Sequence, residues 1–422
     1  MFRVIRDLNN PNLGKTIILG HAQTWSLTMI PFYELILPKR ILFGVGKRRD
    51  IGTAAKPFGH RAVIVYGSRT LETNGEIRKL VKCLENAGIS VLTTENIAHE
   101  PEVSDVDNIV ERLRSSILPG DFIIGFGGGS AIDLAKAIAA LLPQPSAVSV
   151  LEYLEGVGSG MTINEPPLPI VAVPTTAGTG AEATKNAVIA SYHPLFKKSL
   201  RDNALIPGLV IADPELTLSC PKQITAASGM DAVTQLIESY VSKKHQPVTD
   251  ALVEQALPVA VRALTVLGSN NADGNGIVAA RCGMMHAAMI SGITLANAGL
   301  GMAHGIAPAL GTHCRIPHGT ACALLLPVAL RVNADVCLAR YGNLGRLVTG
   351  NAALTDEQAT ERLIAEIVEL CKLLDLPQSL RQIGVRDEMF PVLARDSKGS
   401  SMSGNPKELS ESDVENILRS IA

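Results

Sequence analysis

The chain has 422 residues, of which 46% are hydrophobic and only 18% are charged. This composition excludes a globally disordered protein, and the length favours two or three domains. With 38 Lys and Arg against 40 Asp and Glu, the net charge is −2, which excludes a general electrostatic attraction to nucleic acid or to an anionic membrane. We expect neither as a partner.

The cysteines and the N-terminal segment bear on the compartment. Seven cysteines occur without a CxxC pair, which predicts reduced thiols in a cytoplasmic protein rather than a disulfide framework. No uninterrupted apolar run reaches the ~20 residues that span a bilayer. Residues 1–31 lack the pattern of a secretory signal, and we interpret them as an N-terminal extension.

The first half of the chain alternates apolar runs with amphipathic helical patterns. In chain order we expect a strand at 61–67, a helix at 74–88, a strand at 89–95, a helix at 104–116, a strand–turn–helix unit at 121–142, and a strand followed by a loop at 168–184. Such alternation predicts a doubly wound α/β domain with a parallel sheet, to which we assign residues 32–212.

The second half shows almost only helical periodicity. Helices are expected at 223–242, 251–268, 276–299 and 359–376. We therefore predict an all-helical domain over residues 213–422. A cleft between two domains is a favoured ligand site, so we expect the active site there.

Two small-residue loops follow strands of the first domain. Gly127, Gly128, Gly129 and Ser130 lie between an apolar strand and a helix, where adjacent glycines and free N–H groups suit a phosphate. A tight turn that needs glycine for packing is the alternative. The loop with Thr175, Thr176 and Thr179 offers hydroxyls at a second strand end. Because ligands of open α/β sheets lie beyond the strand ends, the pair favours a dinucleotide.

Potential metal ligands occur in the helical half. Asp231 and Gln235 are four residues apart and share one helix face, and His304 and His318 follow in apolar helical segments. A carboxylate, an amide oxygen and two imidazoles could hold a divalent cation such as Fe²⁺ or Zn²⁺. Pro308, four residues after His304, predicts that the helix kinks or ends beside that histidine.

These segments together resemble the iron-containing (group III) alcohol dehydrogenase family over roughly residues 32–422. The matching stretches include GFGGGSAIDLAKAIA (125–139), VPTTAGTGAEAT (173–184), ASGMDAVTQLIESYVS (227–242), ANAGLGMAHGIAPALG (296–311) and IPHGTACALLLP (316–327). The resemblance implies an NAD(P)-dependent dehydrogenase that moves hydride between nicotinamide and a small alcohol or aldehyde. It implies a Rossmann-like first domain, a metal that acts as a Lewis acid, and a homodimer or larger assembly.

The resemblance also assigns residues. It places Gly127, Gly128, Gly129, Ser130 and Asp133 at the pyrophosphate and nicotinamide ribose, and Thr175, Thr176 and Thr179 in the second nucleotide loop. Lys197, or its neighbour Lys198, falls near a cofactor-contacting lysine. The metal positions correspond to Asp231, Gln235, His304 and His318.

Three positions depart from the family pattern. Typical members carry histidine where this chain has Gln235, and a second histidine where it has Pro308. His313 or a chain of water molecules is the candidate to replace that lost proton relay. Many NAD-preferring members end the first strand with aspartate, whereas this chain has Gly67, Ser68 and Arg69, which favours binding of the 2′-phosphate of NADP.

Two alternative functions stay open at this point. Metal-independent maleylacetate reductases resemble the same family, so a metal-free reductase of a keto or aldehyde acid is one alternative. A pseudoenzyme or scaffold subunit that retains nucleotide binding is the other, since Gln235 and Pro308 both weaken the expected metal chemistry.

Overall fold

The computed structural model describes residues 16–19, 23–26, 30, 32–67, 69–145, 148–269 and 273–422. The chain divides into two units, Met1–Leu35 and Ile36–Ala422. In the first unit, strands β1 (Thr16–Leu19) and β2 (Gln23–Ser26) pair antiparallel. Most of the extension predicted for residues 1–31 lies outside the described residues, so its role stays open.

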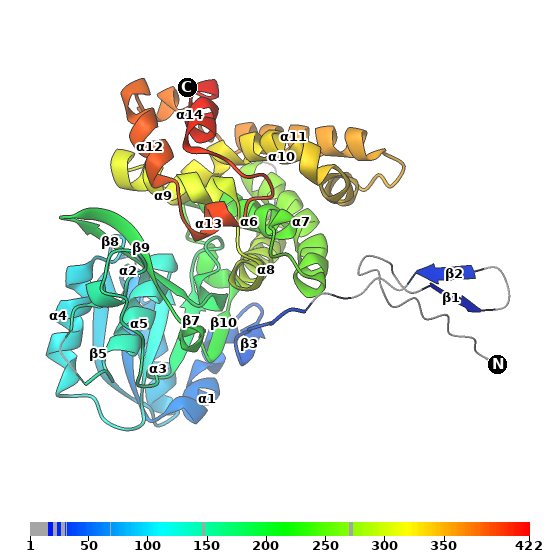
Figure 1. Ribbon diagram of the computed structural model, residues 1–422. Helices are drawn as coiled ribbons and strands as arrows, with labels where there is room; N and C mark the ends of the chain where they lie inside the picture. Colours follow the sequence, from blue (N-terminus) through cyan, green and yellow to red (C-terminus); the bar gives the residue numbers. More distant parts are fainter. Residues whose placement is uncertain are drawn as a thin grey trace. The chain divides into compact units, whose positions relative to one another are not determined.

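The second unit begins with a six-stranded parallel sheet (Figure 1). Its order across the sheet is β3 (Arg40–Phe43), β10 (Leu209–Ala212), β7 (Ile170–Pro174), β6 (Asp121–Gly127), β4 (Arg61–Gly67) and β5 (Ser90–Ile97). The chain runs from β4 outward to β5 and then returns to β6 on the other side of β4. This reversal makes the space beyond β4 and β6 the switch point, where open α/β sheets bind their ligands.

Helices cover both faces of the sheet. One face carries α1 (Ile51–Ala55), α2 (Arg69–Thr73) and α3 (Glu76–Asn86), and the other carries α4 (Val103–Arg114) and α5 (Gly129–Leu141). Strand β4 shows why both faces need cover: Ile64 packs with the first group and Val63 with the second, because successive side chains of a strand point to opposite faces. The alternating pattern of the sequence predicted this arrangement, and it is confirmed.

A hairpin and several short segments complete the first half. Strands β8 (Asn186–Tyr192) and β9 (Leu195–Arg201) pair antiparallel outside the main sheet. The described residues of this half also form the 3-10 segments η1 (Lys47–Asp50), η2 (Lys56–Phe58), η3 (Val150–Tyr153), η4 (Ala181–Ala183), η5 (Asn203–Leu205) and η6 (Pro214–Thr217), whereas η7 (Arg381–Ile383) and η8 (Asp387–Met389) lie in the second half.

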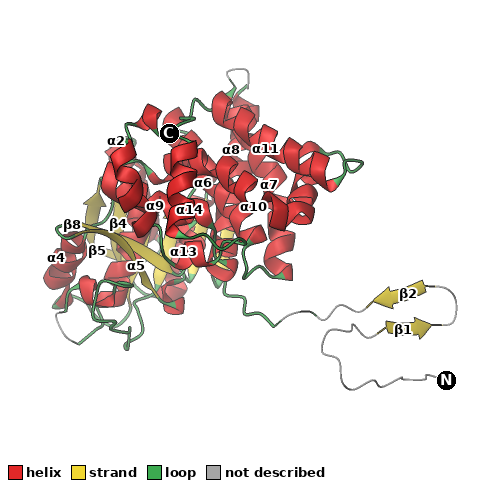
Figure 2. Cartoon of the chain, turned by 45° about the horizontal axis from the view of Figure 1, so that its top comes forward, coloured by secondary structure: helices red, strands yellow, loops and turns green. Residues whose placement is uncertain are grey.

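The second half of the chain is helical, as predicted (Figure 2). Its helices are α6 (Lys222–Val241), α7 (Pro247–Gly268), α8 (Gly274–Ala298), α9 (Met302–Cys314), α10 (His318–Thr349), α11 (Asp356–Leu373), α12 (Phe390–Asp396), α13 (Ser400–Ser403) and α14 (Glu411–Ser420). One apolar core joins α6, α7, α8, α10 and α11, and a second joins α9, α12 and α14 to the first turns of α10. The predicted boundary after residue 212 follows β10 directly, and the domain limits stay a prediction because Ile36–Ala422 forms one compact unit.

Three of these helices are apolar enough to cross a membrane by length and composition alone. They are α7, α8 and α10. The absence of an uninterrupted apolar run does not exclude them, because their few polar residues are spread out. In the structure their apolar side chains contribute to the shared helical core. The expected absence of a membrane partner stays a prediction.

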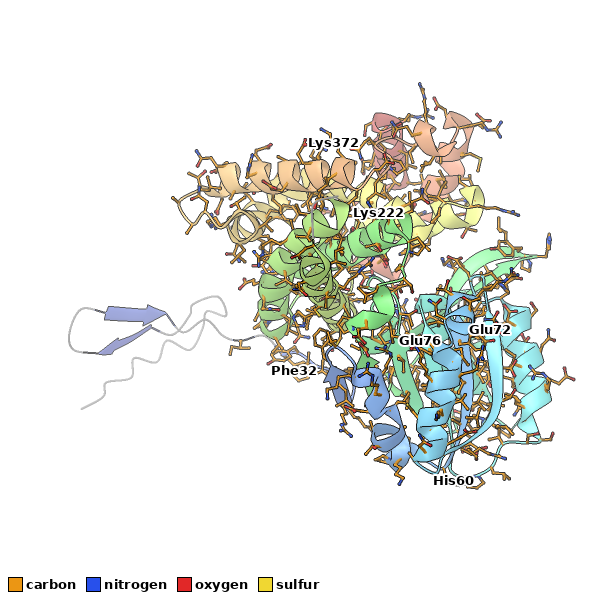
Figure 3. The ribbon with its side chains drawn as sticks, turned by 180° about the vertical axis from the view of Figure 1, so that it is seen from behind. Phe32, His60, Glu72, Glu76, Lys222 and Lys372 are labelled. Atoms are coloured by element: carbon orange, nitrogen blue, oxygen red, sulfur yellow. The ribbon has the colours of Figure 1, made fainter. Side chains whose placement is uncertain are left out.

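The carboxyl ends of the parallel strands face the helical half. His60, just before β4, lies at the end of the sheet away from those helices, and Glu72, just after β4, lies nearer to them (Figure 3). The loops that follow β6 and β7 are therefore directed at the helical half, and the candidate site residues of both halves can meet.

Candidate active site

The glycine turn after β6 is shaped by close contacts with β4 and with the next helix. A Cβ atom on Gly127 would lie 2.9 Å from the backbone nitrogen of Gly67 and 2.7 Å from the Cβ of Ala131. Only glycine fits there, so close packing of the turn is reason enough for a glycine at this position. Gly128 and Gly129 lead into α5, whose first N–H groups point out of the turn beside the switch point.

The two small-residue loops lie side by side. Thr175 donates its N–H to the carbonyl of Gly127 at 2.9 Å. A Cβ atom on Gly128 would meet the Thr176 hydroxyl at 3.2 Å, and one on Gly129 would meet the Thr179 hydroxyl at 3.0 Å. The structure thus places the hydroxyls of the second loop directly against the backbone of the first.

A buried lysine that sequence reasoning missed secures this pair of loops. Lys136 on α5 is fully buried, and its Nζ donates to the carbonyls of Ala181, Thr184 and Asn186 at 2.5, 2.7 and 2.9 Å. Burial lowers the pKa of Lys136 to about 8. Its position seven residues after Gly129, on a helix whose other residues after Asp133 are all apolar, is the signal that could have identified it.

Asp133 and Lys197 lie near each other beside the nucleotide loops. Asp133 Oδ2 accepts the N–H of Val188 at 3.1 Å, and burial raises the pKa of Asp133 to about 6. Lys197 on β9 pairs with Glu100 at 2.5 Å and acts electrostatically on both Asp133 and His318. The lysine therefore lies within electrostatic range of both Asp133 on α5 and His318 on α10.

The residues predicted to choose between NAD and NADP lie at the end of β4. Gly67 ends the strand, and Arg69 begins α2 with an exposed side chain. Ser68 lies outside the described residues. Position 67 itself carries no carboxylate, and the carboxylates that act electrostatically on the neighbouring Tyr66 are Glu72 on α2 and Glu95 on β5.

Asp231, His304 and His318 come from three different helices and converge. Oδ1 of Asp231 on α6 lies 3.1 Å from Nε2 of His304 on α9 and 3.6 Å from Nε2 of His318 on α10. Burial alone would raise the pKa of Asp231, but the two histidines lower it, so the carboxylate stays ionised. Burial lowers the pKa of His318 to about 4, which keeps that imidazole neutral near pH 7. An ionised carboxylate and a neutral imidazole are the forms that bind a metal.

Glu238 orients His304 and was not identified from the sequence. Its Oε2 lies 2.7 Å from Nδ1 of His304, and the carboxylate also accepts N–H bonds from Gly301, Ala303 and His304 at the start of α9. Burial opposes a charge on His304, but its contacts with Cys322, Asp231 and Glu238 raise the pKa well above the usual value. The bond to Nδ1 directs Nε2 toward Asp231. Glu238 is seven residues after Asp231, so helical periodicity places both on one face of α6.

Cys322 is a fourth member of the cluster that the sequence reading overlooked. Ligand atoms of Asp231, His304, His318 and Cys322 all lie within 4.8 Å of one another. The thiol is fully buried, and burial raises its pKa to about 12. Cys322 follows His318 by one helical turn, which is the signal that could have found it. One oxygen, two nitrogen and one sulfur donor around one buried point fit a divalent metal.

Gln235 links the cluster to the nucleotide loops. Its Oε1 accepts a hydrogen bond from Ser291 Oγ at 2.7 Å, and its Nε2 lies 3.4 Å from the carbonyl oxygen of Thr179. Thr179 in turn contacts Gly129. Thr179 therefore lies between the glycine turn and the helix face that carries Gln235 and Asp231. The role of Gln235 as a metal ligand stays a prediction.

A second contact between the halves is so close that only glycine fits. A Cβ atom on Gly292 of α8 would lie 2.2 Å from the carbonyl oxygen of Gly180, at the end of the threonine loop. We expect Gly292→Ala to lower the free energy of unfolding by about 1–3 kcal/mol and to weaken cofactor binding by displacing this loop. Chemical unfolding and cofactor titration measure both effects. Gly274→Ala on the same helix is the control, because its Cβ meets open space; equal behaviour of the two variants would contradict the contact.

The structure differs from two further predictions for the region around His304. His313 pairs with Asp396 at 2.7 Å, toward the end of α9, and it is not part of the cluster of four ligand residues. It is therefore not brought to the site as the replacement relay. The helix does not end beside His304, since α9 continues through Pro308 to Cys314.

Comparison with known proteins agrees with this geometry. Residues 38–214 match the family described as iron-containing alcohol dehydrogenase, and residues 225–422 match the C-terminal family of Fe-containing alcohol dehydrogenases. An NADPH-dependent butanol dehydrogenase from Clostridium saccharobutylicum is 30% identical over 91% of this chain and 97% of that protein. A 1,3-propanediol dehydrogenase from Citrobacter freundii is 31% identical over 92% and 98%.

The solved structures give the same answer for the fold. A crystal structure of a 1,3-propanediol oxidoreductase superposes with a TM-score of 0.84 at 29% identity, covering 93% of this chain and 100% of that one. The family resemblance noted from the sequence is thereby confirmed, and with it an oxidoreductase that uses NAD(P) and a divalent metal. The chain belongs to the iron-containing alcohol dehydrogenase family.

Proposed function

We propose that Asp231, His304 and His318 hold the divalent metal beside a nicotinamide bound over the glycine turn, and that the chain interconverts a small alcohol and its aldehyde there. The observation that carries this proposal is the convergence of three ligand side chains from three helices. The Gln235–Thr179–Gly129 contacts support a cofactor site next to them. The related butanol and 1,3-propanediol dehydrogenases suggest small aliphatic alcohols as the substrate class.

The metal chemistry needs a site that is buried and fixed. The metal, when bound, supplies Lewis-acid polarisation of the substrate oxygen. Asp231 contributes the negative charge, and Glu238 fixes the ring of His304 so that Nε2 is available. His318 is the most accessible of the three, with 28% of its side chain exposed, so the substrate approaches from its side.

The cofactor assignment follows the same reasoning. The nicotinamide accepts or donates the hydride. Gly128, Gly129 and Ser130 at the start of α5 present N–H groups to the pyrophosphate, and the hydroxyls of Thr176 and Thr179 border the same space. Exposed Arg69 and the lack of a carboxylate at Gly67 support NADP over NAD.

Metal removal tests the function. Oxidation of small primary alcohols and diols with NAD and with NADP is measured on the purified enzyme, after anaerobic chelation, and after Fe²⁺ or Zn²⁺ is restored. We expect turnover to fall about 100-fold or more and to return with metal, because Lewis-acid activation contributes several kcal/mol. Undiminished turnover in protein shown to be metal-free would contradict the proposal and favour the metal-independent reductase. No turnover on the whole panel would favour the scaffold alternative.

Location and assembly belong to the same proposal. All seven cysteines are free, which supports a reducing, cytoplasmic compartment. A homodimer or larger assembly is expected from the family resemblance, and light scattering of the purified protein measures it directly.

A further inference from the structure

The thiol of Cys322 faces the same point as the three proposed metal ligands. Its Sγ lies 3.6 Å from Nε2 of His304 and 3.6 Å from Nε2 of His318. The side chain is completely buried on the first turns of α10, one turn after His318. Both histidine contacts involve the nitrogen that faces Asp231, so the sulfur is on the ligand side of each ring.

The separations match those of a tetrahedral metal site. Bonds of about 2.0 Å from zinc to nitrogen or oxygen and 2.3 Å to sulfur give sulfur–nitrogen edges of about 3.5 Å and nitrogen–oxygen edges of about 3.3 Å. The sulfur–nitrogen distances here are 3.6 Å, and those from Asp231 to the two histidines are 3.1 and 3.6 Å. These four atoms therefore need little movement to bind one ion.

Residue 235 is a poorer fourth ligand than this thiol. The carbonyl oxygen of Gln235 already accepts the Ser291 hydroxyl at 2.7 Å, and its amide nitrogen is directed at Thr179. A neutral amide oxygen also binds Fe²⁺ or Zn²⁺ less strongly than a thiolate does.

We propose that Cys322 is the fourth protein ligand of the metal, so that an Asp–His–His–Cys set replaces the ligand lost at Gln235. This inference rests on the proposed metal-assisted function. A thiolate with two imidazoles in tetrahedral geometry selects Zn²⁺ over Fe²⁺, since soft sulfur donors and d¹⁰ zinc suit each other, and such zinc expands to five ligands when the substrate oxygen binds. The chain thus has a zinc-selective site within a family described as iron-containing.

Cobalt substitution tests the sulfur ligand without reference to activity. Co²⁺ takes zinc ligand sets, and a bound thiolate adds a near-ultraviolet charge-transfer absorption that oxygen and nitrogen ligands do not give. We expect this absorption in the wild-type protein and in Cys337→Ser, and its loss in Cys322→Ser. Cys337 is the matched control because it is buried on the same helix, α10, and is not part of the cluster.

Affinity and selectivity give a second readout. Zinc affinity should fall about 100-fold or more in Cys322→Ser, given that loss of mere outer-shell partners already costs 10–100-fold. The preference for Zn²⁺ over Fe²⁺ in anaerobic competition should fall with it, and Cys337→Ser should match the wild type. Should Cys322→Ser fail to fold, zinc-edge X-ray absorption of the wild-type protein answers the same question, with one sulfur expected at about 2.3 Å.

The outcomes separate this inference from the function on which it rests. A wild-type protein that binds one Co²⁺ without the sulfur absorption, or whose zinc shows no sulfur neighbour, overturns the Cys322 ligand and leaves the Asp231, His304 and His318 site intact. A wild-type protein that binds no divalent metal overturns both proposals.

Discussion

Asp231→Ala will yield a protein without bound metal and with turnover reduced by about 1,000-fold, because Lewis-acid activation contributes several kcal/mol and each 1.4 kcal/mol is about a factor of ten. Asp231 is the charged member of the cluster, is buried, and touches both histidines. Its removal leaves two imidazoles and a thiol, a set with too little negative charge to hold a divalent ion tightly. Elemental analysis and steady-state kinetics of the variant measure the two effects.

A matched control separates this result from a general loss of charge. Asp335 lies on α10 in a surface ion pair with Lys407, so Asp335→Ala should retain full metal content and full turnover. If Asp231→Ala binds as much metal as this control, the assignment of the metal site is wrong.

Glu238→Gln will weaken metal binding about 10–100-fold, although Glu238 contacts no metal in the proposed site, because it fixes the ring of His304. The carboxylate accepts Nδ1 of His304 at 2.7 Å and three N–H groups at the start of α9. Glutamine has one acceptor oxygen, so its NH₂ group would face donors. We also expect the free energy of unfolding to fall by about 2 kcal/mol from these unsatisfied buried groups. Metal titration and chemical unfolding measure the two changes.

A comparison of metal affinity with turnover at excess metal identifies Glu238 as the residue that orients His304. Excess metal should restore most of the turnover of Glu238→Gln, since the direct metal ligands remain, whereas Asp231→Ala should not recover. Glu254→Gln is the control: Glu254 accepts the hydroxyl of Tyr240 at 2.8 Å, next to the same helix, and does not contact His304. A Glu238→Gln protein with wild-type metal affinity would show that its carboxylate only caps α9.

The sequence predicted those parts of the site whose residues form short, continuous motifs. Gly127–Gly129 follow a buried strand and precede a helix, and local geometry then dictates the turn and its free N–H groups. Strand alternation likewise predicted the parallel sheet. Asp231, His304 and His318 were predicted to be ligands, but no spacing along the chain could show that α6, α9 and α10 meet, since that depends on packing between distant segments.

The residues that were missed were within reach of helical periodicity. Glu238 is two turns after Asp231, and Cys322 is one turn after His318, so each shares a face with a ligand. Both were missed because only Asp231, Gln235, His304 and His318 were considered as metal ligands. Lys136 is different. Four oxygen atoms of Ala181, Thr184 and Asn186 surround its ammonium group, and only the three-dimensional structure shows this.

Pro308 and His313 show what local patterns leave open. A proline inside a helical pattern predicts an end or a kink; α9 does not end at Pro308 but runs from Met302 to Cys314, with Glu238 accepting N–H groups at its start and its apolar face packed in the core, while the kink stays a prediction. His313 was plausible by residue type, but it lies nine residues from His304, about 13 Å along the helix axis, and it pairs with Asp396.

The central claim is that the metal lies among Asp231, His304 and His318 and borders the nicotinamide over the glycine turn. Crystals of the metal-loaded enzyme with NADP, measured on both sides of the metal absorption edge, test it most directly. We expect one anomalous peak within bonding distance of all three side chains. The nicotinamide ring should border the place where the substrate meets the metal. A peak elsewhere, or a nicotinamide bound away from these residues, would contradict it.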